Sequence, residues 1–127
     1  MQKILVAEDS YALANLLEFV LQSAGFEVHV FPTGRTAYEA ALGQKFDMIL
    51  LDQQMPEMTG VEVAEALREG DSDNKETPIF LCTAKTHELD LESIKDQLQL
   101  TGVFHKPFSP KDLVDKLVKE TSEISSY

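Results

Sequence analysis

Hydrophobic residues along the chain alternate between short runs and longer stretches that have the period of a helix. Residues 3–7 form a short, mostly apolar run that ends at two acidic residues. From Leu13 to Ala24, apolar side chains recur at the i, i+3, i+4 and i+7 spacing of one helical face. Gly25 follows at once, in the position after a helix end that favours glycine. The pattern predicts a strand followed by a helix.

Four later runs have the length of strands but differ in their polar positions. Residues 26–30 alternate between apolar and polar, as in a strand with one solvated face. Residues 48–51 and 79–82 are apolar throughout, which is typical of parallel strands covered by helices on both faces. A fifth strand is expected through residues 103–105. We therefore expect the alternating strand to lie at an edge of the sheet.

Helical stretches separate these strands and follow the last one. They are expected near 35–43, 60–69, 88–99 and 110–121. The last helix is expected to begin with Ser109 as its N-cap, Pro110 at N1 and Asp112 at N3, which is a favourable start for a helix.

Five β/α units with right-handed crossovers leave few topologies open. The favoured one is a doubly wound, five-stranded parallel sheet in the order 2-1-3-4-5, the flavodoxin-like α/β fold. Residues 1–127 are expected to form a single domain, because the polar stretch 70–77 is too short to link two domains. Residues 121–127 are polar and are expected to fray.

Composition excludes several classes of function. The chain has 22 acidic and 11 basic side chains, for a formal net charge of -11. It therefore lacks the basic surface that binding to nucleic acids or to anionic membranes requires. Its apolar runs are too short for a signal peptide or a membrane span, and the single cysteine, Cys82, permits no intrachain disulfide. We expect a cytoplasmic protein that binds neither nucleic acid nor membrane directly.

Acidic side chains follow two of the expected strands at the edge where such sheets bind ligands. Glu8 and Asp9 end the first strand and Asp52 ends the third, and in the order 2-1-3-4-5 these strands flank the ligand-binding crevice. Thr83 ends the fourth strand and Lys106 follows the fifth. Three clustered carboxylates repel one another, and without compensation at least one would take up a proton; a hard divalent cation and the Lys106 ammonium are the two groups available to compensate. Carboxylates with few other ligands suit Mg2+, and Mn2+ is an alternative.

A phosphate group fits this crevice as well. Its charge would be neutralised by the metal ion, by Lys106 and by the Thr83 hydroxyl. With a divalent cation in place, one of the carboxylates could attack phosphorus and form an acyl phosphate. Catalysis would then consist mostly of in-line positioning and charge stabilisation.

The same residues make the chain similar to a known family. It resembles the receiver domain of two-component response regulators, the phosphoacceptor module that a histidine kinase phosphorylates. The matching segments are residues 4–10 (ILVAEDS), 48–60 (MILLDQQMPEMTG), 78–84 (PIFLCTA) and 106–108 (KPF). Each motif ends its own expected strand, and no part of the chain is left over for a second domain.

The resemblance implies a role for each matching residue. It makes Asp52 the phosphoacceptor and makes Glu8 and Asp9 ligands of the metal, together with Asp52 itself. The backbone carbonyl of Gln54 corresponds to a further metal ligand. These assignments are carried over from the family by motif position.

Other matches concern the phosphoryl group and its lifetime. Thr83, followed by Ala84, matches the hydroxyl that engages the phosphoryl group and reorganises the next loop, and Lys106 matches the lysine that pairs with the phosphoryl oxygens. The Lys106–Pro107 bond is often cis in this family. Gln54 and Lys85 flank the expected approach of the hydrolytic water, and we expect them to tune the lifetime of the acyl phosphate.

Val103 departs from the family pattern. Receivers usually carry tyrosine or phenylalanine three residues before the lysine, and here that position is valine. The neighbouring Phe104 is expected to point to the opposite face of its strand, because side chains alternate. We expect a loop movement centred on Thr83 to remain, with altered signalling through the surface of the fourth helix and fifth strand.

The leading hypothesis is a signalling switch rather than a metabolic enzyme. A sensor histidine kinase or a phosphotransfer protein would phosphorylate Asp52, the affinity for a partner would change, and the chain would catalyse its own dephosphorylation. The partner is a downstream protein or an output domain absent from this chain. Both a natural single-domain regulator and a receiver excised from a longer protein remain open, although Met1 favours a native start.

Two alternatives come from other classes. An Asp-nucleophile phosphohydrolase would act on a diffusible substrate, but such enzymes usually carry a second aspartate where this chain has Gln54. A degenerate receiver would act as an unphosphorylated interaction module. Against it, the chain retains residues of the expected type at all five site positions.

Overall fold

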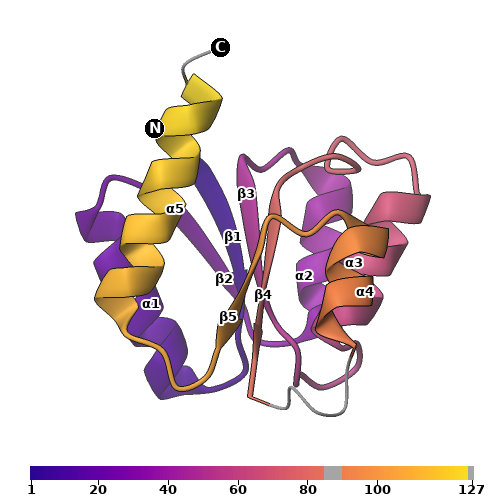
Figure 1. Cartoon of the computed structure of the whole chain (residues 1–127), viewed down its shortest axis with the longest axis horizontal. Helices are drawn as coiled ribbons and strands as arrows, with labels where there is room; N and C mark the ends of the chain where they lie inside the picture. The colour runs from indigo at the N-terminus through magenta and orange to yellow at the C-terminus, as the bar shows by residue number, and fades with distance from the viewer. Residues whose placement is uncertain (85–89, 126–127) are drawn as a thin grey trace.

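The computed structural model describes residues 1–84 and 90–125 of the chain. Strands and helices alternate along it, and the strands form one parallel sheet in the order β2-β1-β3-β4-β5, which confirms the predicted fold class and topology. Helices α1 and α5 cover one face of the sheet, and α2, α3 and α4 cover the other (Figure 1). The elements are β1 (Lys3–Ala7), α1 (Tyr11–Ser23), β2 (Glu27–Phe31), α2 (Gly34–Gly43), β3 (Met48–Asp52), α3 (Gly60–Glu69), β4 (Ile79–Thr83), α4 (Leu91–Leu98), β5 (Gly102–His105) and α5 (Pro110–Ser125).

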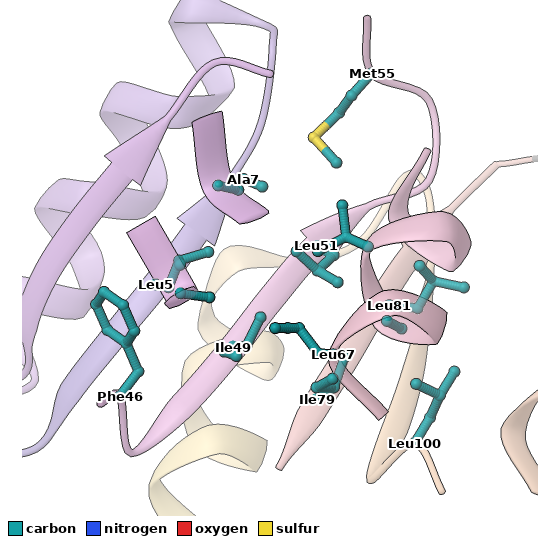
Figure 2. Packing of buried hydrophobic residues seen from close by; sticks show 14 residues of the cluster. Leu5, Ala7, Phe46, Ile49, Leu51, Met55, Leu67, Ile79, Leu81 and Leu100 are labelled. Carbon is teal, nitrogen blue, oxygen red and sulfur yellow. The ribbon is translucent and has the colours of Figure 1, made fainter. Parts of the chain in front are cut away.

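The hydrophobic core has two layers because alternate residues of each strand face opposite sides of the sheet. Every residue of β3 and of β4 is buried, whereas β2 contains none that is fully buried, as the alternating pattern predicted for an edge strand. Figure 2 shows the layer under α2, α3 and α4, in which Phe46 packs with side chains of the central strands. Ile4, Met48 and Phe80 belong to the opposite layer, under α1 and α5.

Most helix boundaries agree with the predicted ones. Gly25 has a φ of 99° just after α1, which confirms its predicted position. The Ser109 hydroxyl accepts a hydrogen bond of 3.3 Å from the backbone N–H of Asp112, which confirms the N-cap of α5. That helix continues to Ser125, so it ends later than the predicted residue 121. Helix α4 begins after its N-cap Asp90, and the earlier part of its predicted range lies outside the described residues.

The polar stretch 70–77 contains buried residues that the sequence did not predict. The Asn74 side chain is fully buried; its Oδ1 accepts a hydrogen bond of 2.8 Å from the backbone N–H of Phe46. Its Nδ2 donates to the carbonyls of Ala41 and Gln44 at 2.6 and 2.7 Å. These bonds tie the loop after α3 to the connection between α2 and β3, and so hold the start of β3 in place.

Candidate functional site

The predicted residues meet at the edge formed by the carboxyl ends of the strands. Glu8 follows β1, Asp52 is the last residue of β3, and Lys106 follows β5. A pocket of about 250 Å³ opens at this edge. It is lined by Glu8, Asp9, Ser10, Asp52, Gln54, Ala84 and Lys106.

The three carboxylates form the acidic part of the pocket. One oxygen from each of Glu8, Asp9 and Asp52 lies within 4.8 Å of the others. Only 4% of Glu8 and 5% of Asp52 is exposed, whereas Asp9 is exposed at the mouth of the pocket. The site therefore has two carboxylates held away from water and a third in contact with it.

Lys106 supplies the positive charge of the pocket. Its Nζ atom lies 3.2 Å from Glu8 Oε1 and 3.1 Å from Asp52 Oδ1, so one ammonium group bridges the two buried carboxylates. Its backbone N–H donates a hydrogen bond of 3.0 Å to the carbonyl of Thr83, which fixes the start of the loop that carries it. The Lys106–Pro107 peptide bond is cis, as the resemblance implied.

One lysine does not compensate fully for the buried negative charge. Burial raises the pKa of Asp52, and the charge of Asp9 adds to this, although the hydrogen bond and charge of Lys106 act in the opposite direction. Burial also raises the pKa of Glu8, despite a backbone hydrogen bond from Ser10 and the nearby Lys106. Both carboxyl groups therefore remain easier to protonate than in solvent.

The same contacts keep Lys106 charged. Burial by itself would lower the pKa of its ammonium group, but the hydrogen bond and charge of Asp52, together with the charge of Glu8, outweigh burial and raise it. Even with Lys106 charged, the pKa values of the two buried carboxyl groups stay raised. A further positive charge in the pocket would therefore be stabilised by these carboxylates.

Local hydrogen bonds orient the acidic side chains. The backbone N–H of Ser10 donates to Glu8 Oε2 at 3.0 Å, while the Ser10 hydroxyl caps α1 by accepting a bond of 3.4 Å from the N–H of Leu13. The start of α1 thus fixes the Glu8 carboxylate. Sequence reasoning did not assign Ser10 to the site, although a serine just before a helical pattern is a recognisable N-cap signal.

The loop after β3 keeps α3 away from Asp52. Helix α3 is capped by Thr59 and Glu62, so Asp52 is not its N-cap. Gln53 ties the loop to the helix: its carbonyl accepts from the Gly60 N–H at 3.1 Å, and its side-chain oxygen accepts from the Val61 N–H at 2.8 Å. Sequence reasoning missed Gln53, and no local signal distinguishes it from the adjacent glutamine.

Three of the four other predicted site residues are described, and they differ from one another in their position relative to the pocket. Thr83 ends β4 but is buried, and the pocket is lined by the following Ala84 rather than by Thr83. Gln54 lines the pocket and is exposed. Lys85, which was predicted to tune the lifetime of the acyl phosphate, lies outside the described residues.

Val103 and Phe104, which are neighbours in β5, lie on opposite faces of the sheet, as predicted. Val103 packs against the layer under α3 and α4, and Phe104 belongs to the layer under α5. The position that is usually aromatic in receivers therefore holds a side chain without a ring, on the α4 side of the sheet.

The oxygen donors of the pocket fit a hard divalent cation. Carboxylate oxygens of Glu8, Asp9 and Asp52 cluster within 4.8 Å, and Asp9 faces solvent, where an ion could keep several of its waters. Among the residues of 1–84 and 90–125 that line the pocket, none is a cysteine or a histidine. The donor set therefore suits Mg2+ in preference to a soft transition metal.

The topology and the pocket define a flavodoxin-like α/β domain with an acidic, lysine-bridged site at the switch point of its sheet. The sequence profile described as "Response regulator receiver domain" matches residues 4–118. The chain therefore belongs to the response regulator receiver domain family of two-component signalling.

Individual relatives agree with this assignment. The chain is 38% identical over 116 residues to the transcriptional regulatory protein SrrA of Staphylococcus aureus (strain NCTC 8325 / PS 47), and the match covers 88% of this chain and 44% of SrrA. The chain thus spans less than half the length of this relative.

Solved structures show the same fold. The chemotaxis response regulator CheY4 of Vibrio cholerae is 35% identical, with a TM-score of 0.83, over 94% of this chain and 98% of that one. The response regulator TrrA of Thermotoga maritima, solved in complex with Mg(2+)-BeF, is 29% identical, with a TM-score of 0.78, over the same shares of 94% and 98%. Within residues 1–84 and 90–125, no helix of the chain has the length and apolar character needed to cross a membrane.

Proposed function

We propose that the chain is a phosphorylation-dependent switch in which Asp52 accepts a phosphoryl group from the phosphohistidine of a histidine kinase or a phosphotransfer protein. The observation that carries this proposal is the position of Asp52 Oδ1, 3.1 Å from Lys106 Nζ, in the same pocket as Glu8 and Asp9. Receiver domains of response regulators interact with histidine kinases and with output domains. The carboxylates and the lysine of this pocket suit the transfer of a phosphoryl group from such a kinase to Asp52.

Asp52 and Lys106 would have different roles in phosphoryl transfer. A carboxylate oxygen of Asp52 attacks phosphorus, the bond from phosphorus to the histidine nitrogen breaks, and an acyl phosphate forms. Lys106 is already bonded to Asp52 and can follow the negative charge onto the phosphoryl oxygens. Because Asp52 is almost fully buried, few water molecules compete for the attacking oxygen.

Glu8, Asp9, Asp52 and the backbone carbonyl of Gln54 would hold the divalent cation, which we take to be Mg2+, with Mn2+ as an alternative. When bound, the ion would neutralise charge on the phosphoryl oxygens. Two observations support this part of the proposal: the clustering of the carboxylate oxygens, and the Mg(2+)-BeF complex of the relative TrrA.

Other residues would govern the steps after phosphoryl transfer. Thr83 and Ala84 stand at the end of β4, next to the pocket, where an added phosphoryl group would draw in a hydroxyl and a backbone N–H. Gln54 and Lys85 would flank the water that hydrolyses the acyl phosphate and so set its lifetime. The resulting rearrangement would change the affinity for a downstream protein or an output domain. A single buried thiol fits a reducing compartment, and we place the exchange in the cytoplasm.

A phosphodonor experiment tests this function. The protein is incubated with Mg2+ and acetyl phosphate, and its intact mass is measured. We expect the gain of one phosphoryl group, which is lost in Asp52→Asn and on chelation of the metal, and retained in the control Asp73→Asn, whose exposed carboxyl lies in the loop after α3. The absence of an adduct under every condition would overturn the proposal in favour of an unphosphorylated interaction module. Multiple turnover of phosphate monoesters would instead indicate the phosphohydrolase.

A further inference from the structure

Three phenylalanine rings form a continuous row on the α1/α5 side of the sheet. The ring of Phe80, in β4, stacks on that of Phe104, in β5, with centroids 5.7 Å apart and planes inclined by 25°. Phe104 in turn contacts Phe108, in the loop before α5, with centroids 6.2 Å apart and planes inclined by 49°. We call these three side chains the phenylalanine row. Its rings connect the sheet to the loop that carries Lys106.

The middle of the row contacts α5. Phe104 is buried in the same core layer as Leu113 and Leu117, which both belong to α5. The Nζ atom of Lys116, also in α5, lies 5.5 Å from the centroid of the Phe104 ring, within the range of a cation–π interaction. A change in the position of the Phe104 ring would therefore alter both the packing and the electrostatic environment of α5.

The end of the row lies beside the site. Phe108 comes two residues after Lys106, whose ammonium bridges Glu8 and Asp52. Phe108 also lines a mostly apolar cavity of about 350 Å³ together with Leu13, Ala84, Lys106 and Pro107. The half-buried ring of Phe108 therefore touches Phe104 and also borders open space, so it has room to take a second position.

We infer that the phenylalanine row couples the Lys106 loop to α5. When Asp52 carries a phosphoryl group, Lys106 exchanges a carboxylate oxygen for a phosphoryl oxygen farther from the strand end, and the backbone of residues 106–108 moves with it. Phe108 then shifts against Phe104 toward the cavity, and α5 repacks. Packed interiors respond to such displacements by moving between discrete arrangements. The inference rests on the proposed function, since a phosphoryl group on Asp52 is its trigger.

The row lies on the face opposite Val103. That side chain packs in the layer under α3 and α4 and has no ring to change its rotamer between the strand and the solvent. The continuous aromatic contacts in β5 are instead those of Phe104, so the inferred coupling runs toward α5 on the other side of the sheet.

Amide spectra of the 15N-labelled chain, with and without Mg2+ and beryllium fluoride, test the coupling. In the wild-type protein, we expect the mimic to shift the amides of residues 52–54, at the site, and of residues 113–118, in α5. In Phe104→Leu, the site shifts should remain while the α5 shifts fall several-fold. The matched control is Phe46→Leu, which removes a fully buried ring from the opposite core layer and should leave the α5 response intact.

The outcomes separate the inference from the proposed function. A Phe104→Leu protein whose α5 response equals that of the wild type overturns the coupling. If that variant does not fold, Phe108→Leu, in which a less buried ring is shortened, provides the same comparison. A wild-type response at residues 52–54 with none in α5 overturns the coupling alone. No wild-type response at residues 52–54 overturns the proposed function and the coupling with it.

Discussion

Lys106 Nζ lies 3.1 Å from Asp52 Oδ1, although these residues belong to the ends of β5 and β3, which are separated in the sheet by β4. The same ammonium group lies 3.2 Å from Glu8 Oε1, beyond the end of β1. A single lysine thus bridges the ends of strands that are not neighbours of its own. This lysine neutralises only one charge of the acidic cluster. The stability of the protein should therefore depend on pH and on added cations.

The stability of the protein should depend on the protonation of Asp52. Burial raises the pKa of this carboxyl above its ordinary value of 3.8, so the folded state holds the proton more tightly than the unfolded state does. The protonated Asp52 carboxyl therefore makes its full contribution to the free energy of unfolding at a pH below 3.8. This contribution is lost as the pH rises through the pKa of the folded state. At neutral pH without a divalent cation, the ionised Asp52 destabilises the fold.

Asp52→Asn should consequently stabilise the protein at pH 7 by on the order of 1 kcal/mol, with a gain that disappears at acidic pH. Urea unfolding of both proteins, from acidic pH to pH 7, measures the difference between their free energies of unfolding. Added Mg2+ should raise the stability of the wild type more than that of Asp52→Asn, because the variant lacks one of the proposed carboxylate ligands of the cation. A stabilisation that is the same at every pH would contradict this explanation.

Removal of the lysine should strengthen cation binding. Lys106 and a divalent cation compete for oxygens of Glu8 and Asp52, so Lys106→Met should tighten Mg2+ binding by about tenfold. Calorimetric titration, or the rise in Tm with added Mg2+, measures the change. Lys111→Met, which removes an exposed lysine from α5, is the matched control and should leave the affinity near that of the wild type. Weaker Mg2+ binding in Lys106→Met would show that the lysine organises the carboxylates rather than competing for them.

The carboxylate and lysine positions could be predicted from the sequence because the topology brings them together. Continuous apolar runs predicted interior parallel strands, and the carboxyl ends of such strands share one edge. The positions of Asp52, at the end of β3, and of Lys106, just after β5, could be predicted from the ends of those strands alone. The burial of Thr83 was not predicted, because a hydroxyl at a strand end suits the pocket and the core alike.

Other features depend on partners that are distant in sequence. Asn74 stands in a polar stretch that predicts a solvated loop, yet it is fully buried because Phe46, Ala41 and Gln44 satisfy its side chain. No local pattern indicates such bonds. The contact between Phe104 and Phe108 could not be predicted either, since the direction of the chain after β5 decides whether the two rings meet.

Arg68 should be a main anchor of α4. No side chain of α4 is fully buried. Three nitrogens of Arg68 donate hydrogen bonds to backbone carbonyls: to Leu98 at 2.8 Å and Gln99 at 3.3 Å, at the end of α4, and to Lys75 at 2.7 Å, in the loop after α3. Arg68→Met should cost about 1–3 kcal/mol of unfolding free energy and accelerate amide exchange in α4.

Hydrogen exchange followed by mass spectrometry, on the segment 91–98, checks this effect. Arg35→Met is the control, because Arg35 is exposed and its ion pair with Glu39 is long, at 4.0 Å. Loss of this pair should change the free energy of unfolding by less than about 0.5 kcal/mol. If exchange in α4 stayed at the wild-type rate in Arg68→Met, the anchoring role would be wrong.

The close approach of α3 to the end of β3 should make Gly60 intolerant of a side chain. A Cβ at this position would lie 2.7 Å from the carbonyl oxygen of Asp52 and 2.7 Å from Leu81 Cδ1. Gly60→Ala must therefore displace either the end of β3, which carries Asp52, or helix α3. We expect a loss of about 1–3 kcal/mol in unfolding free energy and slower phosphorylation by acetyl phosphate.

Gly43→Ala is the matched control: nothing lies within 4 Å of its added Cβ, so that variant should be neutral or slightly more stable, with an unchanged phosphorylation rate. Equal rates and stabilities in both variants would show that the β3–α3 contact does not position Asp52.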